Sequence, residues 1–196
     1  MPYYAQLLRA TLAAFLMPLA VAGAAFAGPL EDGVAAVERQ DYAAALRLFR
    51  PLANQGNDIA QFDLGVMYDK GWGVPRDHVQ AARWYRLAAA QGNADAQYNL
   101  GVLYEDGRRY ADAVKWYREA ADQGLGDAQF SLGLLYAKGQ GVPRDDVQAY
   151  MWFELSAAQD DQSAVSNRDA VAQRMKPEQI AEAQKLAHEW RPKPEQ

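Results

Sequence analysis

Side chains that could carry out chemistry are few in this sequence, and they are scattered along it. His78 and His188 are the only histidines, and the chain of 196 residues contains no cysteine. A structural zinc site needs four ligands, mostly nitrogen or sulfur, and a catalytic one needs three. The sequence therefore predicts no metal site. We interpret both histidines as surface residues, one just inside the start of a helix and the other in the last turn of a helix.

Signatures of nucleophilic and cofactor chemistry are missing as well. No serine begins a Ser-x-x-Lys motif or stands in Gly-x-Ser-x-Gly. The Gly-x-Gly pairs at 71–73 and 139–141 follow predicted helices, whereas a dinucleotide fingerprint follows a strand. The acidic pairs at 145–146 and 160–161 lack the alternating ligand spacing of a calcium loop. We therefore expect no catalytic residue, cofactor or metal; the serines considered are Ser131, Ser156, Ser163 and Ser166.

The strongest signal is a motif, Ala-x-x-x-Leu-Gly-x-x-Tyr, that occurs at 60–68, 96–104 and 128–136. Successive copies begin 36 and 32 residues apart, and a period in this range is typical of solenoids built from helix pairs. The alanine, leucine and tyrosine are four residues apart and share one stripe of a helix. The glycine lets a second helix approach closely, and this gain must exceed its helix penalty of roughly 1 kcal/mol.

Two of the repeats carry a long loop, Gly-x-Gly-Val-Pro-Arg-Asp, at 71–77 and 139–145. The glycines allow a tight reversal, the residue before proline is held extended, and Asp77 is a good N-cap for the next helix. The repeat between them omits four residues, since its motif tyrosine and the following tryptophan are 12 residues apart, against 16 in the other two. Short and long repeats therefore alternate.

Together with Ala-x-x-Trp-Tyr-x-x-Ala-Ala at 81–89 and 113–121, these motifs resemble the Sel1-like repeat family, the bacterial cousins of the tetratricopeptide repeat. The resemblance implies an all-α fold, a right-handed α-solenoid of stacked antiparallel helix pairs. We expect the repeat domain to span 28–190 and a disordered tail to follow at 191–196. The pairs are expected at about 28–58, 59–94, 95–126 and 127–161, with a degenerate cap at 162–190.

The two ends of this array depart from the motif. The first pair carries Asp32 where later repeats carry leucine, and a polar residue there suits an end cap with no neighbour before it. In the last pair, Arg168-Asp169 replaces Leu-Gly. Pro177 stands where a final helix begins, the position that proline favours.

Residues 1–27 differ from the rest of the chain. Arg9 is their only charge, an apolar run follows it, and the segment ends in the small-x-small sequence Ala25-Phe26-Ala27. This pattern predicts a secretory signal peptide cleaved between Ala27 and Gly28, and hence a periplasmic or secreted protein. A retained anchor is the alternative, although the run is rich in alanine and short for a membrane span. We expect no membrane association after cleavage.

The charge balance bears on the partner. Without Arg9 the chain has 19 basic and 25 acidic residues, a net charge of 19 − 25 = −6, and it contains no basic block. A nucleic-acid partner is therefore disfavoured. Because cysteine is absent, an exported form of this protein has no disulfides and depends on packing alone.

The resemblance also implies a function, since Sel1-like proteins commonly serve as adaptors in envelope assembly, polysaccharide export, periplasmic signalling and host contact. It implies a non-enzymatic scaffold that binds a peptide or protein partner in the bacterial periplasm or cell envelope. One alternative is a cell-wall-related or β-lactam-binding enzyme like the cysteine-rich members, which the lack of cysteine and of Ser-x-x-Lys disfavours. Another is a structural homo-oligomer.

The same resemblance implies where a partner binds. In tetratricopeptide-like superhelices the first helix of each pair lines a concave groove, and side chains on either side of the motif glycine project into it. Aromatic residues flanked by charges would suit an extended peptide or a partner helix; the alternative is that they pack against neighbouring repeats. Carried over by position, the candidate residues are Phe62, Val66, Asp69, Tyr98, Val102, Glu105, Phe130, Leu134 and Lys138.

Overall fold

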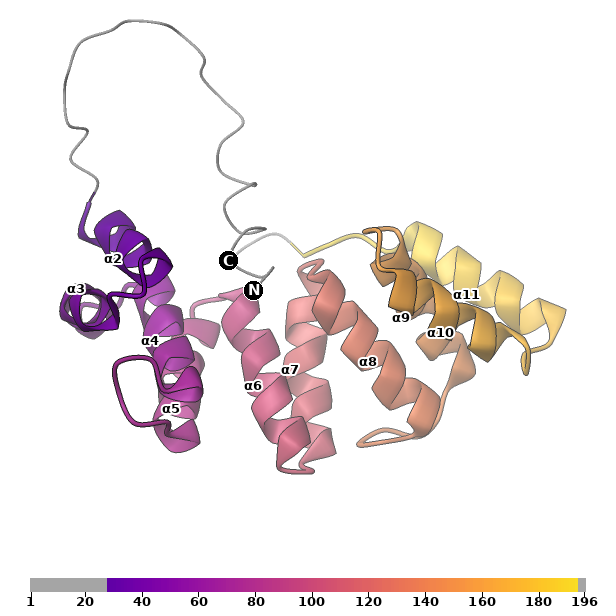
Figure 1. Ribbon diagram of the computed structural model, residues 1–196. Coiled ribbons are helices and arrows are strands. Elements are labelled where there is room, and N and C mark those ends of the chain that lie inside the picture. The colour runs from indigo at the N-terminus through magenta and orange to yellow at the C-terminus, as the bar shows by residue number, and fades with distance from the viewer. Residues whose placement is uncertain (1–27, 194–196) are drawn as a thin grey trace, which may run out of the picture.

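A computed structural model describes residues 28–193. Within this range the chain forms ten helices and no strand, which confirms the predicted all-α repeat solenoid. The helices follow one another in an arc from α2 to α11 (Figure 1). The predicted signal peptide at 1–27 and residues 194–196 of the predicted tail lie outside the described residues.

The helices up to α9 form antiparallel pairs of a first and a second helix, and α10 and α11 follow in the same order. The first helices are α2 (Pro29–Glu38), α4 (Asp58–Lys70), α6 (Ala94–Asp106), α8 (Gly126–Lys138) and α10 (Gln162–Ala172). The second helices are α3 (Tyr42–Asn54), α5 (His78–Ala89), α7 (Tyr110–Asp122), α9 (Asp146–Ala157) and α11 (Pro177–Glu189). Helices up to α10 pack chiefly against their neighbours in the chain, as expected where nearest-neighbour contacts set stability.

The glycine of each motif lies at the contact between the two helices of its pair. A β-carbon placed on Gly101 would overlap the aromatic ring of Tyr117 in α7, and one on Gly65 would overlap the ring of Tyr85 in α5. In the fourth pair, Phe153 takes the same place over Gly133. The predicted reason for the glycine, close approach of a second helix, is confirmed.

The long loops and helix starts follow the local sequence. Gly71 and Gly139 end their helices in the left-handed conformation, with φ of 73° and 69°. Asp77 caps α5 as predicted, because its carboxylate accepts hydrogen bonds from the backbone N–H groups of Val79 at 2.9 Å and Gln80 at 3.0 Å. Pro177 is the first residue of α11, as predicted.

A ladder of glutamines joins consecutive pairs. Gln97 lies buried in the first turn of α6, and its amide donates to the carbonyl of Ala89 at the end of α5, over 3.3 Å. Gln123, at the end of α7, donates to Gln97 Oε1 over 2.7 Å and to the carbonyl of Gly92 over 2.9 Å. The same side-chain pairing recurs in the second and fourth pairs, between Gln91 and Gln61 and between Gln159 and Gln129.

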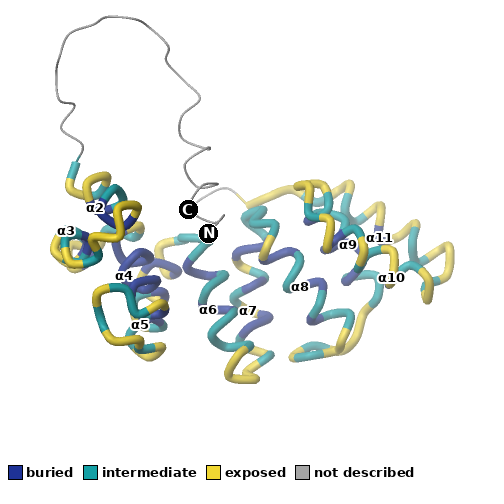
Figure 2. The backbone as a smooth tube through the Cα atoms, in the orientation of Figure 1, coloured by how far each residue is buried: buried dark blue, intermediate teal, exposed yellow. Residues whose placement is uncertain are grey.

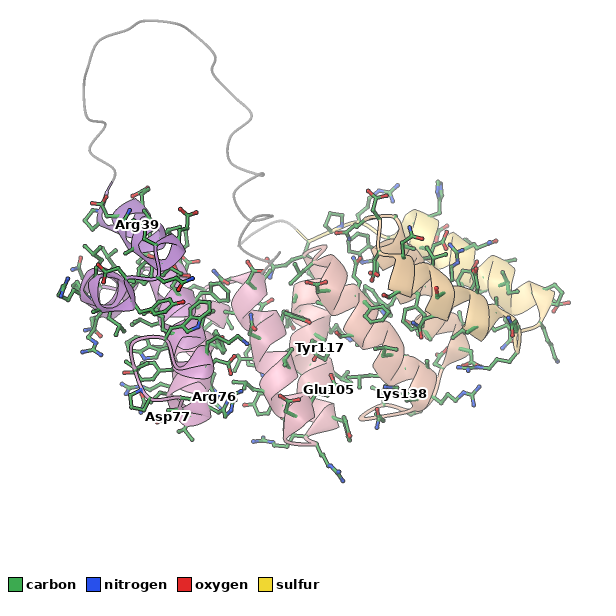
Figure 3. All side chains as sticks on the ribbon, in the orientation of Figure 1. Arg39, Arg76, Asp77, Glu105, Tyr117 and Lys138 are labelled. Carbon is green, nitrogen blue, oxygen red and sulfur yellow. The ribbon has the colours of Figure 1, made fainter. Side chains whose placement is uncertain are left out.

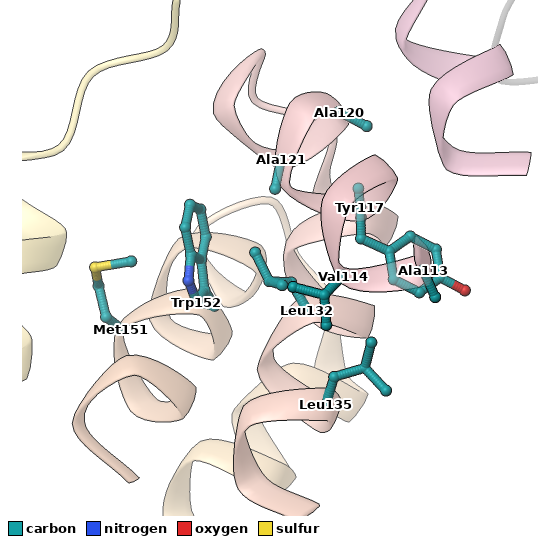
Figure 4. Packing of buried hydrophobic residues seen from close by; sticks show 10 residues of the cluster. Ala113, Val114, Tyr117, Ala120, Ala121, Leu132, Leu135, Met151 and Trp152 are labelled. Carbon is teal, nitrogen blue, oxygen red and sulfur yellow. The ribbon is translucent and has the colours of Figure 1, made fainter. Parts of the chain in front are cut away.

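The apolar core runs through the array rather than gathering at one centre, and buried segments recur in successive helix pairs (Figure 2). One cluster joins α7, α8 and α9 through Val114, Leu132, Leu135 and Trp152 (Figure 4). The motif leucines Leu64, Leu100 and Leu132 are fully buried, whereas Asp32 at the same position of α2 is exposed. The N-terminal helix therefore presents a polar residue where α4, α6 and α8 present core.

The C-terminal end departs from the expected stacked pair. Helix α11 packs against α9 and makes little contact with α10. Asp169 stands where the other first helices have glycine. Its side chain keeps a second helix from approaching α10 as closely as in the other pairs. Lys193, within the predicted disordered tail, lies against α7, where its ammonium pairs with the Asp122 carboxylate at 2.6 Å and its backbone N–H donates to the Asp122 carbonyl.

Candidate functional site

The expected aromatic row exists, and each of its members packs inside its own helix pair. Phe62 contacts the ring of Tyr85 at 5.9 Å between centroids, and Tyr98 contacts that of Tyr117 at 5.6 Å. Phe130 contacts Phe153 at 5.7 Å. In each case the partner ring is also the ring that lies over the motif glycine. One aromatic residue of each of these second helices therefore contacts both the glycine and the aromatic side chain of the row.

Burial divides the nine candidate residues into two groups. In α4, Phe62, Val66 and Asp69 are each only 8% exposed, so they offer a partner almost no surface. Here the alternative interpretation fits better, since Phe62 and Val66 belong to one buried apolar cluster with Ala96 and Leu100 of the next repeat. The remaining candidates keep partial or full exposure: Tyr98, Val102, Glu105, Phe130 and Leu134 are half-buried and Lys138 is exposed.

Polar groups gather around Tyr98. The Tyr117 hydroxyl donates a 2.8 Å hydrogen bond to Glu105 Oε2, and these two side chains point toward one another (Figure 3). Ser131, in the next first helix, is a near neighbour of the Tyr98 phenol. Burial raises the pKa of Tyr98, and the negative charge of Asp127 adds to that shift. Tyr98 therefore remains a neutral hydroxyl between two repeats.

Asp69 makes its polar contacts within its own repeat. Its carboxylate lies 2.8 Å from the Lys70 ammonium and 3.0 Å from Nδ1 of His78, at the start of α5. Its backbone carbonyl accepts a 2.8 Å bond from the guanidinium of Arg76. Asp69 thus holds the long loop against the end of α4. His78 lies at a helix start, and His188 in the last turn of α11, as predicted.

The structure reveals carboxylates that the sequence analysis missed. Asp63, Asp95, Asp127 and Asp161 interact electrostatically in succession along the first helices, and we call them the acidic line. Asp95 and Asp127 recur one repeat apart, directly before the motif alanine. That recurrence is the signal that could have revealed them.

Asp63 is the most perturbed member of the acidic line. Burial raises the pKa of its carboxyl to about 7, and the negative charge of Asp95 adds to the shift. Its side chain is buried, and no donor among the described residues reaches Oδ2. Burial likewise raises the pKa of Asp95 and of Asp127, each with a contribution from the next carboxylate in the line. An unpaired buried carboxylate is costly, and taking up a proton relieves that cost.

Nothing in this region resembles a reaction centre. Among residues 28–193, no group of three histidine or acidic side chains is placed to hold a metal ion. No helix in that range is long and apolar enough to cross a membrane. The arrangement supplies aromatic surface, hydroxyls and negative charge, which are binding groups.

Comparison with known proteins agrees with the geometry. Four stretches match the Sel1 repeat family, at residues 22–57, 58–93, 94–125 and 126–161. A Sel1 repeat protein from Oxalobacter formigenes shares 31% sequence identity, with a TM-score of 0.71 over 82% of this chain and 70% of that one.

A second solved structure is c5321, a protective antigen of uropathogenic Escherichia coli with an SLR fold. It shares 29% identity, with a TM-score of 0.47 over 83% of this chain and 44% of that chain. No curated protein matches this sequence.

Proposed function

This chain belongs to the Sel1 repeat family, and on that premise we propose that it is a non-enzymatic scaffold that binds a basic segment of a protein partner along its first helices. Proteins with this repeat are commonly protein–protein interaction scaffolds. The proposal includes export to the periplasm, which the composition of residues 1–27 supports.

The observation that carries the proposal is the acidic line beside half-buried aromatic residues. Tyr98 and Phe130 retain surface in consecutive repeats, and Asp95 and Asp127 lie in the first turns of the same two helices. Aromatic side chains with a polar edge are the residues that most often dominate binding at interfaces. A lysine or arginine of the partner would bring positive charge to Asp95 and Asp127, whose side chains are less buried than that of Asp63.

The negative surface also bears on partner choice. Electrostatic complementarity contributes more to specificity and association rate than to affinity. A partner segment with basic residues spaced to meet successive repeats would be attracted, and an acidic one would be repelled. Binding should therefore weaken as ionic strength rises.

The test is capture of partners from a periplasmic extract by the immobilised protein, with Tyr98→Ala as the variant. Truncating an anchor at the centre of an interface typically costs about 2 kcal/mol or more, roughly thirtyfold in affinity. We expect Tyr98→Ala to lose the captured protein while its helical circular dichroism is retained. Lys185→Ala, at an exposed position of α11, is the control and should capture normally.

Melting temperature and capture must be measured on the same sample, because Tyr98 also packs against Tyr117. If Tyr98→Ala melts early but captures the same protein at low temperature, the binding face lies elsewhere. If Asp95→Asn with Asp127→Asn leaves capture and its salt dependence unchanged, the acidic line does not select the partner.

A further inference from the structure

The first turn of a second helix is covered by the loop of the pair that follows it. Over α3, the ring of Trp72 stacks on that of Tyr42, with centroids 5.2 Å apart and planes at 13°. A β-carbon on Gly73 would lie 2.9 Å from Tyr42 Cβ and 3.1 Å from Leu46 Cδ1. The long loop at 71–77 is therefore seated on the start of α3, and glycine is needed at 73 because of this close approach.

Two other second helices are covered in the same manner. Gly141 of the loop at 139–145 lies against the backbone of Tyr110 and Ala111, at the start of α7. At the start of α9, Arg174 from the last loop binds the Asp146 carboxylate at 2.7 and 2.9 Å. Each of these helix starts is closed by a segment about one repeat further along the chain.

The start of α5 lacks such a cover. The loop that would supply it is 107–109, which is four residues shorter than the loops at 71–77 and 139–145 (three residues against seven). A hollow of about 390 Å³ remains between α5 and the end of α6. Its lining includes His78, Val79, Ala82, Leu103, Tyr104 and Gly107.

The lining differs from its equivalents in a way that enlarges the hollow. Ala82 stands where α3 has Leu46 and α7 has Val114. Val79 is 77% exposed, the most exposed of the large apolar side chains in the described part of the chain. Covering apolar surface of this kind lowers the free energy, so it favours binding.

We propose that this hollow is a docking site for a glycine-containing apolar turn of a partner protein, which takes the place of the loop that the third pair lacks. The shape of the occupant follows from the two seated loops, in which a glycine allows the backbone to approach the helix start and a neighbouring bulky side chain packs beside it. This site is separate from the acidic line.

The rim of the hollow carries charges of both signs. The guanidiniums of Arg86 and Arg109 lie over the Tyr104 ring, at 5.8 and 4.6 Å from its centroid. Arg86 Nη2 also donates to the Tyr104 hydroxyl at 2.8 Å. Asp106 also lines the hollow, and Arg109 forms an ion pair with the Asp112 carboxylate at 2.7 Å, so the rim has no net positive charge and selects its occupant by shape and apolar surface.

A second copy of the chain is a poor occupant. The loops at 71–77 and 139–145 have the right sequence, but both are already seated on α3 and α7 of their own chain. Releasing either one would uncover the helix start that it protects. The occupant is therefore a different protein.

The test uses the capped heptapeptide Gly-Trp-Gly-Val-Pro-Arg-Asp, the sequence of residues 71–77, titrated into isotope-labelled protein and followed by NMR. We expect saturable shifts at Val79, Ala82 and Leu103.

Two protein variants close the hollow. Ala82→Leu introduces the side chain that α3 has, and a graft replaces 107–109 with the sequence of 71–77. Both should weaken peptide binding at least tenfold, and the graft should raise the melting temperature. Leu87→Ala, at an exposed position of the same helix outside the hollow, should bind as the parent does. Tyr98→Ala should also bind normally, which separates this site from the proposed function.

Absence of shifts at saturating peptide would overturn the proposal, and so would shifts that persist in the graft. Sedimentation at rising protein concentration examines the other occupant. Self-association that Ala82→Leu abolishes would show that a second copy fills the hollow and would overturn the assignment to a different protein.

Discussion

The amide of Gln123 donates a hydrogen bond to Gln97 Oε1 over 2.7 Å, and through it the end of α7 is tied to the start of α6. Gln97 in turn donates to the last turn of α5. Two side chains therefore join three helices from two consecutive pairs, at a place where backbone carbonyls would otherwise be left unpaired at a helix end.

This relationship predicts that Gln97→Leu lowers stability although the two side chains are similar in size. The Ala89 carbonyl would lose a donor and the Gln123 amide would lose an acceptor. Unsatisfied buried polar groups cost about 1–3 kcal/mol each. Thermal unfolding followed by circular dichroism measures the change. Gln173→Leu, at an exposed position after α10, should leave the melting temperature nearly unchanged, and an equal loss in both variants would show that the ladder does not contribute.

Gly101→Leu should destabilise strongly, because its side chain would have to displace the Tyr117 ring. Overpacking of a helix contact typically costs about 1–3 kcal/mol. Its central place in the array should also uncouple the two halves, so that denaturant unfolding becomes broader. Gly107→Ala is the matched control, since a β-carbon there would meet its nearest neighbours at 3.5 Å. A melting temperature of Gly101→Leu equal to that of the control would contradict the assigned contact.

Asp63 predicts a specific dependence of stability on pH. Its pKa in the folded chain, about 7, exceeds its ordinary value of 3.8, so the folded state binds this proton more tightly than the unfolded state does. The resulting stabilisation is fully present below about pH 4 and is lost as the pH rises through about 7. Asp63→Asn cannot ionise and should therefore melt higher than the parent at about pH 8, with little difference at about pH 4.

The control for this pH series is Asp106→Asn, which alters an exposed carboxylate at the end of α6. It should leave the pH profile of the melting temperature close to that of the parent. If Asp63→Asn and the parent show parallel profiles between pH 4 and 8, the pKa of Asp63 is not raised in the folded chain.

The predicted export of the protein can be tested at its N-terminus. Cells that express the full chain should yield a protein that begins at Gly28 and is released by osmotic shock, because Ala25-Phe26-Ala27 forms a cleavage site. Intact-mass spectrometry measures the N-terminus. Recovery of a chain that retains Met1, or recovery only with membranes, would refute the predicted location.

Local sequence determined much of this fold. The motif spacing predicted helix pairs, the glycine predicted the closest contact within each pair, and Asp77 and Pro177 marked helix starts. These features depend on residues within one repeat, where propensity, capping and periodicity act over a few turns of chain. The alternation of short and long loops could also be predicted, because it follows from the number of residues between the motifs.

Tertiary stacking decided the rest, because the decisive contacts join residues about one repeat apart. Motif position placed Phe62 and Tyr98 in one row, but stacking buries the first and leaves the second half-exposed. The raised pKa of Asp63 arises from desolvation and from the approach of Asp95, neither of which spacing alone reveals. The loop at 107–109 is four residues shorter than the long loops. This difference leaves a hollow over α5 only because each long loop covers the preceding second helix, which is a property of the stacked array.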